Sequence, residues 1–277
     1  MTEPGDPADR LIATLRGYGS CVVAYSGGGD SAVVAKAAAV ALGDRAVAVT
    51  GVSDSLAAGE AEAATDLARR IGLRHRLIST GEFARPAYVR NGPDRCYHCK
   101  TELYDLLEAV RADEGFAVVA SGANADDVGD YRPGMNAAAE HRVVAPLLEL
   151  GLTKRDVRAL AASWDLPVAD KPATPCLSSR VAYGTEVTPD RLRRIDASER
   201  LLRERGFTTC RVRLHPGELA RIEVDPSEVA RLTDEATRRE VVAALTALGW
   251  NYVTVDLAGF RSGSFAPLIP LVTLTSS

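Results

Sequence analysis

The feature that most constrains the fold is an alternation of short apolar runs and amphipathic segments in the first part of the chain. Residues 20–25 form an apolar run that predicts a buried strand, and the glycines at 27–29 end it. Residues 30–42 carry apolar side chains at helical spacing, and residues 45–52 form a second, β-branched run. This order predicts a parallel crossover, and hence a doubly wound α/β sheet that binds ligands at the carboxyl ends of its strands.

The alternation continues to about residue 168, so residues 1–168 are interpreted as one domain. Its further predicted helices cover residues 9–18, 56–71, 97–112 and a stretch from 153, and its further strands cover 75–78, 116–120 and 142–145. Residues 169–187 show no usable periodicity and are too long for an ordinary connector, so they are interpreted as an interdomain loop that carries Cys176.

Residues 188–277 are predicted to form a smaller α+β domain for substrate binding or oligomerisation. The elements expected there are a helix over 188–205, strands over 209–214 and 219–224, one or two helices within 226–248, and a strand over 252–257.

Composition argues against several classes of protein. The 277 residues include 33 Lys and Arg and 37 Asp and Glu, and the resulting net charge of -4 argues against a generally basic nucleic-acid-binding surface. No apolar stretch reaches the roughly 18 residues of a membrane span, and no signal region opens the chain, so a cytoplasmic protein without a membrane partner is expected. The odd number of cysteines, 5, favours thiol, metal or catalytic roles over a disulfide framework.

The glycine loop, residues 26–31, joins the first strand to the first helix of the crossover and is predicted to bind phosphate. Its residues are Ser26, Gly27, Gly28, Gly29, Asp30 and Ser31. Glycines allow the backbone to approach an anion, and the N-H groups of the helix start point at it. The Lys-Ser/Thr pair of a Walker loop is missing. A dinucleotide fingerprint with Asp54 as ribose acid is an alternative, although Asp30 beside a phosphate favours a triphosphate with Mg²⁺.

Three cysteines are candidate metal ligands. Cys96 and Cys99 form a CxxC at the start of a predicted helix, and Cys176 lies in the interdomain loop. Three thiolates favour an iron-sulfur or zinc centre, with a zinc site completed by His98 or an inert or disulfide-forming pair as alternatives. The remaining two, Cys21 and Cys210, fall in predicted strands and are expected in the core.

Charged side chains supply further candidates. Carboxylates that follow a strand can hold Mg²⁺ against phosphates, and the candidates are Asp126, Asp127 and Asp130, with Asn124 beside them. Three arginines, Arg180, Arg211 and Arg213, could grip a substrate phosphate through bidentate hydrogen bonds. Arg211 and Arg213 share one face of a predicted strand, so a solvated stripe is the alternative.

Several spaced motifs together resemble the LarE family, and the resemblance runs from about residue 15 to about residue 265. The motifs are residues 26–31, 122–134, 176–184, 212–213, 221–223 and 252–263. The first resembles the SGGxDS signature of the PP-loop ATP pyrophosphatases, whose fold is adenine nucleotide alpha hydrolase-like. LarE proteins are ATP-dependent sulfur transferases that build the nickel-pincer nucleotide cofactor of lactate racemase.

The resemblance implies a specific reaction and site. ATP with Mg²⁺ would adenylate a carboxylate of pyridinium-3,5-biscarboxylic acid mononucleotide, with release of pyrophosphate, and sulfur would then form a thiocarboxylate. Asp30 and Cys176 would be catalytic, and Arg213 and Glu223 would bind substrate. Cys176 matches the sulfur-bearing cysteine, which in some members becomes dehydroalanine. In others three cysteines hold a [4Fe-4S] cluster, and this chain has all three. The family also implies a homo-oligomer.

Three alternatives remain at this stage. A tRNA thiolase also has a PP-loop and three cysteines, but the acidic net charge weighs against it. An NAD(P)-dependent oxidoreductase stays open because Gly29 stands where the signature often has Ile or Val. The third is a non-enzymatic iron-sulfur or zinc binding module.

Overall fold

The computed structural model describes residues 6–128, 133–169 and 175–261. The chain divides into two compact units. Unit 1 comprises Met1–Glu82 and Cys96–Pro175, and unit 2 comprises Phe83–Arg95 and Cys176–Ser277. Unit 2 therefore includes a segment from the first half of the chain, which no sequence pattern indicated.

Unit 1 is built on a four-stranded parallel sheet with the strand order β3-β2-β1-β4. The strands are β1 (Cys21–Ala24), β2 (Ala46–Val52), β3 (His75–Ser79) and β4 (Val118–Ala120). The chain first builds outward from β1 through β2 and β3, and then returns to place β4 on the other side of β1. The strand order thus reverses between β1 and β4, and ligands of such sheets bind outside the carboxyl ends of the strands at this point.

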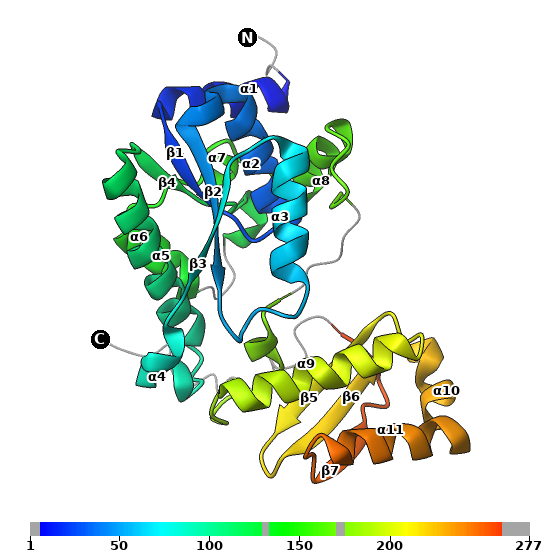
Figure 1. Ribbon diagram of the computed structural model, residues 1–277. Helices are drawn as coiled ribbons and strands as arrows, with labels where there is room; N and C mark the ends of the chain where they lie inside the picture. Colours follow the sequence, from blue (N-terminus) through cyan, green and yellow to red (C-terminus); the bar gives the residue numbers. More distant parts are fainter. Residues whose placement is uncertain (1–5, 129–132, 170–174, 262–277) are drawn as a thin grey trace. The chain divides into compact units, whose positions relative to one another are not determined.

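Helices cover both faces of this sheet (Figure 1). The side chains of Cys21 and Val23 on β1 pack in one core, with α1 (Pro7–Tyr18), α2 (Gly29–Leu42), α3 (Glu60–Ile71) and α8 (Lys154–Ser163). Val22 points to the opposite core, because successive strand residues face opposite sides. That second core contains side chains of α5 (Arg95–Glu114) and α6 (Pro133–Glu140), while the short α7 (Pro146–Glu149) adds Leu147 to the first.

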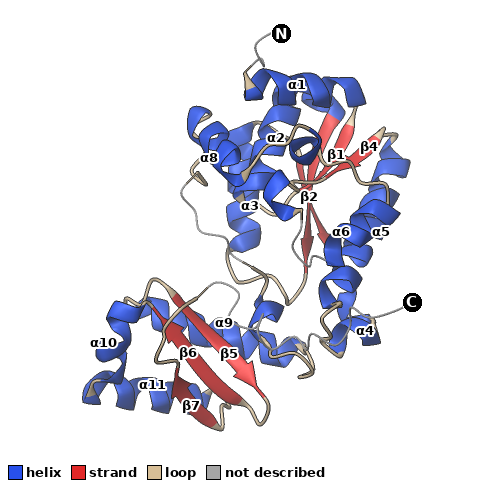
Figure 2. Cartoon of the chain, turned by 180° about the vertical axis from the view of Figure 1, so that it is seen from behind, coloured by secondary structure: helices blue, strands red, loops and turns tan. Residues whose placement is uncertain are grey.

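Unit 2 contains a three-stranded sheet with the order β5-β6-β7 (Figure 2). β5 (Cys210–His215) is antiparallel to β6 (Leu219–Val224), and β6 is parallel to β7 (Tyr252–Val255). The helices of this unit are α4 (Pro86–Val89), α9 (Pro189–Glu204), α10 (Val229–Thr233) and α11 (Glu235–Ala247). The predicted fold class, a doubly wound α/β sheet with a smaller α+β part, is confirmed.

Two predicted elements differ in detail, and a third is made specific. Residues 142–145 make only an isolated parallel bridge between Val144 and Ala120, because Pro146 starts α7 directly afterwards. The helix predicted from residue 56 begins after Gly59, whose φ of 83° is left-handed. The 226–248 stretch is divided at Asp234, whose carboxylate accepts hydrogen bonds from Ala236 N and Thr237 N and so begins α11.

None of the helices in the described ranges combines the length and the apolar character that a membrane crossing requires.

Candidate functional site

The glycine loop of unit 1 connects β1 to α2 and is organised by its two serines. Ser31 Oγ lies 3.1 Å from Ser26 Oγ and donates to Gly28 O, also at 3.1 Å. Gly27 has a φ of 71°, and a Cβ there would lie 3.0 Å from the Cβ of Ala64 on α3, so only glycine fits.

The start of α2 is suited to binding an anion. Gly28 is the N-cap and supplies no side-chain hydrogen bond, so the first N-H groups of the helix are left to other acceptors. Ser26 is exposed, and Gly28, Gly29 and Asp30 are half-buried. The helix dipole adds partial positive charge at this end, and phosphate is the ligand that such a site favours.

The loop that follows β4 packs directly against the first turn of α2. A Cβ at Gly122 would lie 2.8 Å from Ser31 N and 3.0 Å from the carbonyl carbon of Asp30. The two loops that flank the strand-order reversal are therefore in contact, as the predicted ligand site requires.

We expect Gly122→Ala to destabilise unit 1 by about 1 to 3 kcal/mol, because the added methyl group meets backbone atoms that must move. Gly17→Ala is the matched control. Gly17 is exposed near the end of α1, no atom lies within 4 Å of the added Cβ, and the change should stabilise the protein by up to about 1 kcal/mol. Urea denaturation measures the stability of both variants. A midpoint of Gly122→Ala equal to that of the parent would contradict the close packing.

The predicted magnesium ligands after β4 have structural partners. Asp127 accepts a hydrogen bond from Asn124 N, and Asp127 Oδ1 lies 4.0 Å from Lys154 Nζ. Asp126 accepts a hydrogen bond from Lys154 N at 2.8 Å and so satisfies the start of α8. Both carboxylates therefore help to fix the loop to α8. The magnesium role of Asp126 and Asp127 stays a prediction, and Asp130 lies outside the described residues.

A third group of polar residues, which the sequence analysis missed, lies after β2 and β3. Ser53 Oγ and Ser55 Oγ both donate hydrogen bonds to Glu82 Oε1, and Glu82 is only 1% exposed. Carboxylates are almost never buried to this extent unless they are paired, and here the two hydroxyl groups are the partners. In the sequence, the only signal for this group is the position of Ser53 and Ser55 after a strand. Glu82 could not be linked to them, because an entire helix and strand separate it from them.

The five cysteines fall into two groups. Cys21 and Cys210 are fully buried in strands, which confirms the prediction for them, and burial raises the pKa of their thiols to about 12 and about 11. Cys96 and Cys176 are exposed and Cys99 is half-buried, and none of the three forms a disulfide. Cys96 and Cys99 lie in the first two turns of α5. Within either unit, the described residues contain no group of three His, Cys, Asp or Glu side chains arranged to hold a metal ion.

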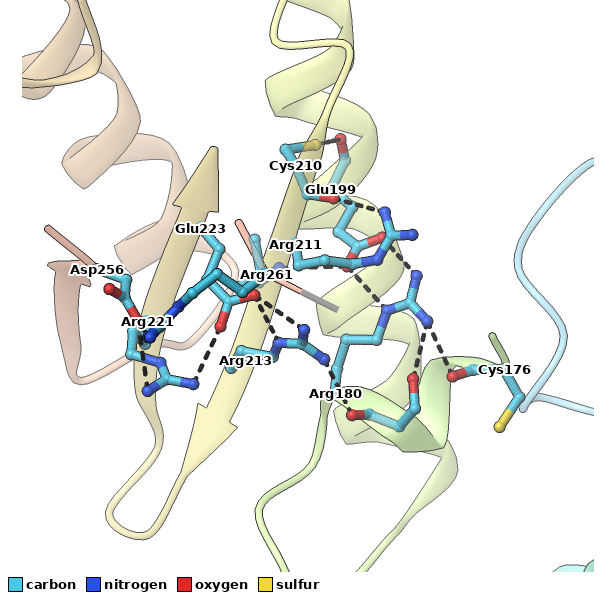
Figure 3. Close-up of polar contacts among 12 residues, drawn as sticks. Cys176, Arg180, Glu199, Cys210, Arg211, Arg213, Arg221, Glu223, Asp256 and Arg261 are labelled. Carbon is cyan, nitrogen blue, oxygen red and sulfur yellow. Dashed lines mark hydrogen bonds and ion pairs between the residues drawn. The ribbon is translucent and has the colours of Figure 1, made fainter. Parts of the chain in front are cut away.

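Cys176 precedes a short 3-10 helix, Leu177–Arg180, whose backbone carbonyls are bound by arginines (Figure 3). Together Cys176 and this helix are called the sulfur turn below. Arg180 Nη1 donates to Cys176 O at 3.0 Å, and Arg213 Nη1 donates to Ser179 O at 3.2 Å. Arg95 Nη1 donates to Ser178 O at 2.7 Å. Three guanidinium groups thus fix the backbone of the turn.

Two buried glutamates hold two of these arginines, Arg180 and Arg213. Arg180, 1% exposed, pairs with Glu199 of α9 at 3.0 Å, and Glu199 itself is fully buried. Glu223, also fully buried, pairs with Arg213 at 2.9 Å and with Arg221 at 3.0 Å. Removing one partner of such a buried pair leaves an uncompensated charge, so these glutamates are required to keep the arginines in place.

Arg211 differs from Arg180 and Arg213 in its interaction partners. Its Nη1 donates to Cys210 O, its guanidinium lies 5.3 Å from the centre of the Phe260 ring, and no described carboxylate is within ion-pair distance. Burial, and next the positive charge of Arg180, lower the pKa of Arg211. A cation held near other cations in this way favours a bound anion.

Unit 2 therefore brings together five of the predicted site residues: Cys176, Arg180, Arg211, Arg213 and Glu223. Unit 1 holds the glycine loop and the two aspartates after β4. Cys96 and Cys99 also belong to unit 1, whereas Arg95, the residue before them, belongs to unit 2.

Comparisons with known proteins give a direct relationship. No protein-family model matches the chain. An uncharacterized protein of Synechocystis is 44% identical over 242 residues, which are 87% of this chain and 90% of the relative. The pyridinium-3,5-bisthiocarboxylic acid mononucleotide synthase of Lactiplantibacillus plantarum is 37% identical over 257 residues, 91% of each chain. Because this identity exceeds 30% and covers nearly the whole of both chains, the chain belongs to the LarE family.

Proposed function

We propose that this protein is an ATP-dependent sulfur transferase that converts a carboxylate of pyridinium-3,5-biscarboxylic acid mononucleotide into a thiocarboxylate. The observation that carries the proposal is its 37% identity, over 91% of the chain, to a synthase whose name gives the bisthiocarboxylic acid mononucleotide as its product. We further propose a cytoplasmic homo-oligomer that acts on this small nucleotide without a nucleic-acid or membrane partner.

ATP is assigned to unit 1. The uncapped start of α2 and the glycine loop suit the triphosphate. Asn124 supports this assignment, because it is fully buried, its Nδ2 has no hydrogen-bond acceptor in the described part of the chain, and a bound nucleotide can supply one. Asp30, Asp126 and Asp127 are the proposed ligands of Mg²⁺, a hard cation that prefers carboxylate oxygens.

The first half-reaction makes the carboxylate reactive. A substrate carboxylate oxygen bonds to the α-phosphorus of ATP, and the bond from that phosphorus to pyrophosphate breaks. The acyl adenylate formed has AMP as a leaving group. A sulfur nucleophile then bonds to the acyl carbon and the bond to AMP breaks, which leaves a thiocarboxylate.

The sulfur is assigned to Cys176, Cys96 and Cys99. None of the three forms a disulfide, two of them are exposed, and an all-thiolate donor set fits an iron-sulfur centre. A [4Fe-4S] cluster held by them would supply an additional sulfide as the nucleophile. In the alternative version, Cys176 forms a thioester with the acyl group, and its Cβ–S bond then breaks as a base removes the Hα. Cys176 is thereby converted to dehydroalanine.

The substrate phosphate is assigned to Arg211, because the other two arginines are paired with buried glutamates. We expect Arg211→Ala to raise the KM for the substrate nucleotide about tenfold or more, since a charge-assisted hydrogen bond is lost, with a smaller effect on the KM for ATP. Arg239→Ala, at an exposed residue of α11, is the control and should leave both constants unchanged. Equal KM values in the Arg211 variant and the parent would assign the phosphate elsewhere.

The test of the function is anaerobic purification followed by assay with ATP and the substrate nucleotide. We expect pyrophosphate and AMP only when the substrate is present, and a product whose mass rises by the difference between sulfur and oxygen for each carboxylate. Iron and sulfide analysis with a visible spectrum tests the cluster. Zinc without iron would refute the cluster, and pyrophosphate without any thiocarboxylate would refute the transferase.

A further inference from the structure

Asp54 follows β2 in unit 1 and has no role in the reaction proposed above. It lies in a turn over residues 53–56, called the serine turn below, which is closed by a hydrogen bond from Leu56 N to Ser53 O at 3.0 Å. On either side of Asp54, Ser53 Oγ and Ser55 Oγ donate hydrogen bonds to the same oxygen of Glu82. Ser55 is buried, whereas Asp54 at the corner of the turn is exposed. The turn therefore presents the carboxylate of Asp54 to a ligand.

The buried glutamate that anchors the serine turn is costly to the protein. Glu82 is 1% exposed, and its Oε2 has no hydrogen-bond donor in the described part of the chain. A buried carboxylate oxygen without a donor lowers stability, and costs of this kind are expected at functional sites. The anchor therefore indicates that the shape of the serine turn is itself required.

The serine turn lies at the same edge of the sheet as the glycine loop. Tyr25 immediately precedes the glycine loop, and its backbone N donates to Val49 O at 2.9 Å while its O accepts from Thr50 Oγ1 at 2.6 Å. β1 ends at Ala24, which pairs with Val49, whereas β2 continues to Val52. At about 3.3 Å per residue, β2 extends roughly 10 Å past the end of β1. The turn thus stands beside and beyond the loop to which the phosphates are assigned.

Charge determines which part of ATP suits a carboxylate at this place. The triphosphate repels Asp54, and the proposed Mg²⁺ ligands belong to the glycine loop and to the loop after β4. The nucleoside is neutral and carries hydrogen-bond donors, whereas an ionised carboxylate only accepts hydrogen bonds. In doubly wound sheets that bind phosphates after the first strand, an acid after the second strand reaches the ribose.

We propose that Asp54 binds the nucleoside of ATP by accepting a hydrogen bond from one of its donors, either a ribose hydroxyl or the 6-amino group of adenine. The inference deepens the proposed function and rests on its assignment of ATP to unit 1. It makes Asp54 a specificity-determining residue, because a triphosphate that lacks the donor loses a hydrogen bond to a charged group.

Calorimetry tests the inference without the substrate nucleotide. ATP, 2′-deoxy-ATP and inosine triphosphate are titrated, each with Mg²⁺, into the parent, Asp54→Ala and Asp54→Asn. The first analogue lacks a ribose hydroxyl, and the second has a carbonyl oxygen in place of the 6-amino group. We expect the parent to bind one analogue about tenfold or more weakly than ATP. This difference should disappear in Asp54→Ala and persist in part in Asp54→Asn, whose amide oxygen still accepts. The analogue that is affected identifies the donor.

Asp66→Ala is the matched control, because Asp66 is an exposed carboxylate of α3 in the same unit, paired with Arg69 at 2.7 Å. It should bind all three triphosphates as the parent does. Equal binding of the three by the parent, or a preference that is unchanged in a folded Asp54→Ala protein, overturns the inference. The expected preferences without any thiocarboxylate in the full assay support Asp54 and refute the transferase. A parent that binds none of the triphosphates refutes both. If Asp54→Ala does not fold, Asp54→Asn decides.

Discussion

Cys176→Ala should separate the two half-reactions completely. Adenylation needs ATP, Mg²⁺ and a substrate carboxylate, whereas sulfur transfer needs the thiol or centre at Cys176. The variant should release pyrophosphate when the substrate nucleotide is added, and no thiocarboxylate should appear in the small-molecule fraction by mass spectrometry. Because Cys176 is exposed at the edge of the sulfur turn, its removal opens no core cavity, and the thermal unfolding midpoint of the apoprotein should not change.

Cys210→Ala is the control within the same unit. Cys210 is fully buried on β5, so this change should lower stability and leave sulfur transfer intact. A thiocarboxylate produced by the Cys176 variant would refute the assignment. The intact mass of the parent after turnover distinguishes the two sulfur sources: loss of the elements of hydrogen sulfide marks conversion of Cys176 to dehydroalanine, whereas an unchanged mass indicates an external sulfur carried by the protein.

The α/β part of the fold could be predicted because its signals are local. Three of the four strands of unit 1 are short apolar runs, the longer helices carry apolar residues at helical spacing, and Gly27 and Gly28 mark the turn between β1 and α2. The residues that follow β1 and β4 could likewise be expected at the same edge of the sheet, since the carboxyl ends of parallel strands lie at one edge.

The sulfur turn could not be predicted, because its contacts are not periodic. The hydrogen bonds of Asn91 reach residues about 90 positions away, and they run from a side chain to backbone carbonyls that every sequence possesses. Nothing in residues 83–95 marks them as part of unit 2. Only the three-dimensional structure reveals such long-range polar contacts.

The arginines show a second limit. A sequence motif identifies Arg180 as important but does not show what its guanidinium binds, and here it binds Glu199 and Cys176 O. The sequence does contain a signal for the burial of Glu199. Glu199 occupies the position between Ile195 and Leu202 on the apolar stripe of α9, where a carboxylate must be buried and paired. A charged residue on an apolar helical face is therefore worth treating as a candidate anchor.

Asp30→Asn should abolish nucleotide chemistry while the fold is kept. Asp30 is half-buried in the first turn of α2, where a carboxylate stabilises the helix by less than about 1 kcal/mol, so its loss is tolerated. As a proposed Mg²⁺ ligand beside the triphosphate it contributes charge that an amide cannot replace. We expect pyrophosphate formation to fall at least about a hundredfold, the effect of removing one preorganised electrostatic group.

Calorimetry with and without Mg²⁺ identifies the cause. In the parent, Mg²⁺ should strengthen ATP binding, and in the variant this gain should disappear. Asp44→Asn, at an exposed residue just after the other end of α2, should behave as the parent. The proposal is contradicted if the parent binds NAD(P) and not ATP, and if Asp30→Asn alters that binding. The glycine loop would then belong to an oxidoreductase, and the adenylation mechanism would be wrong.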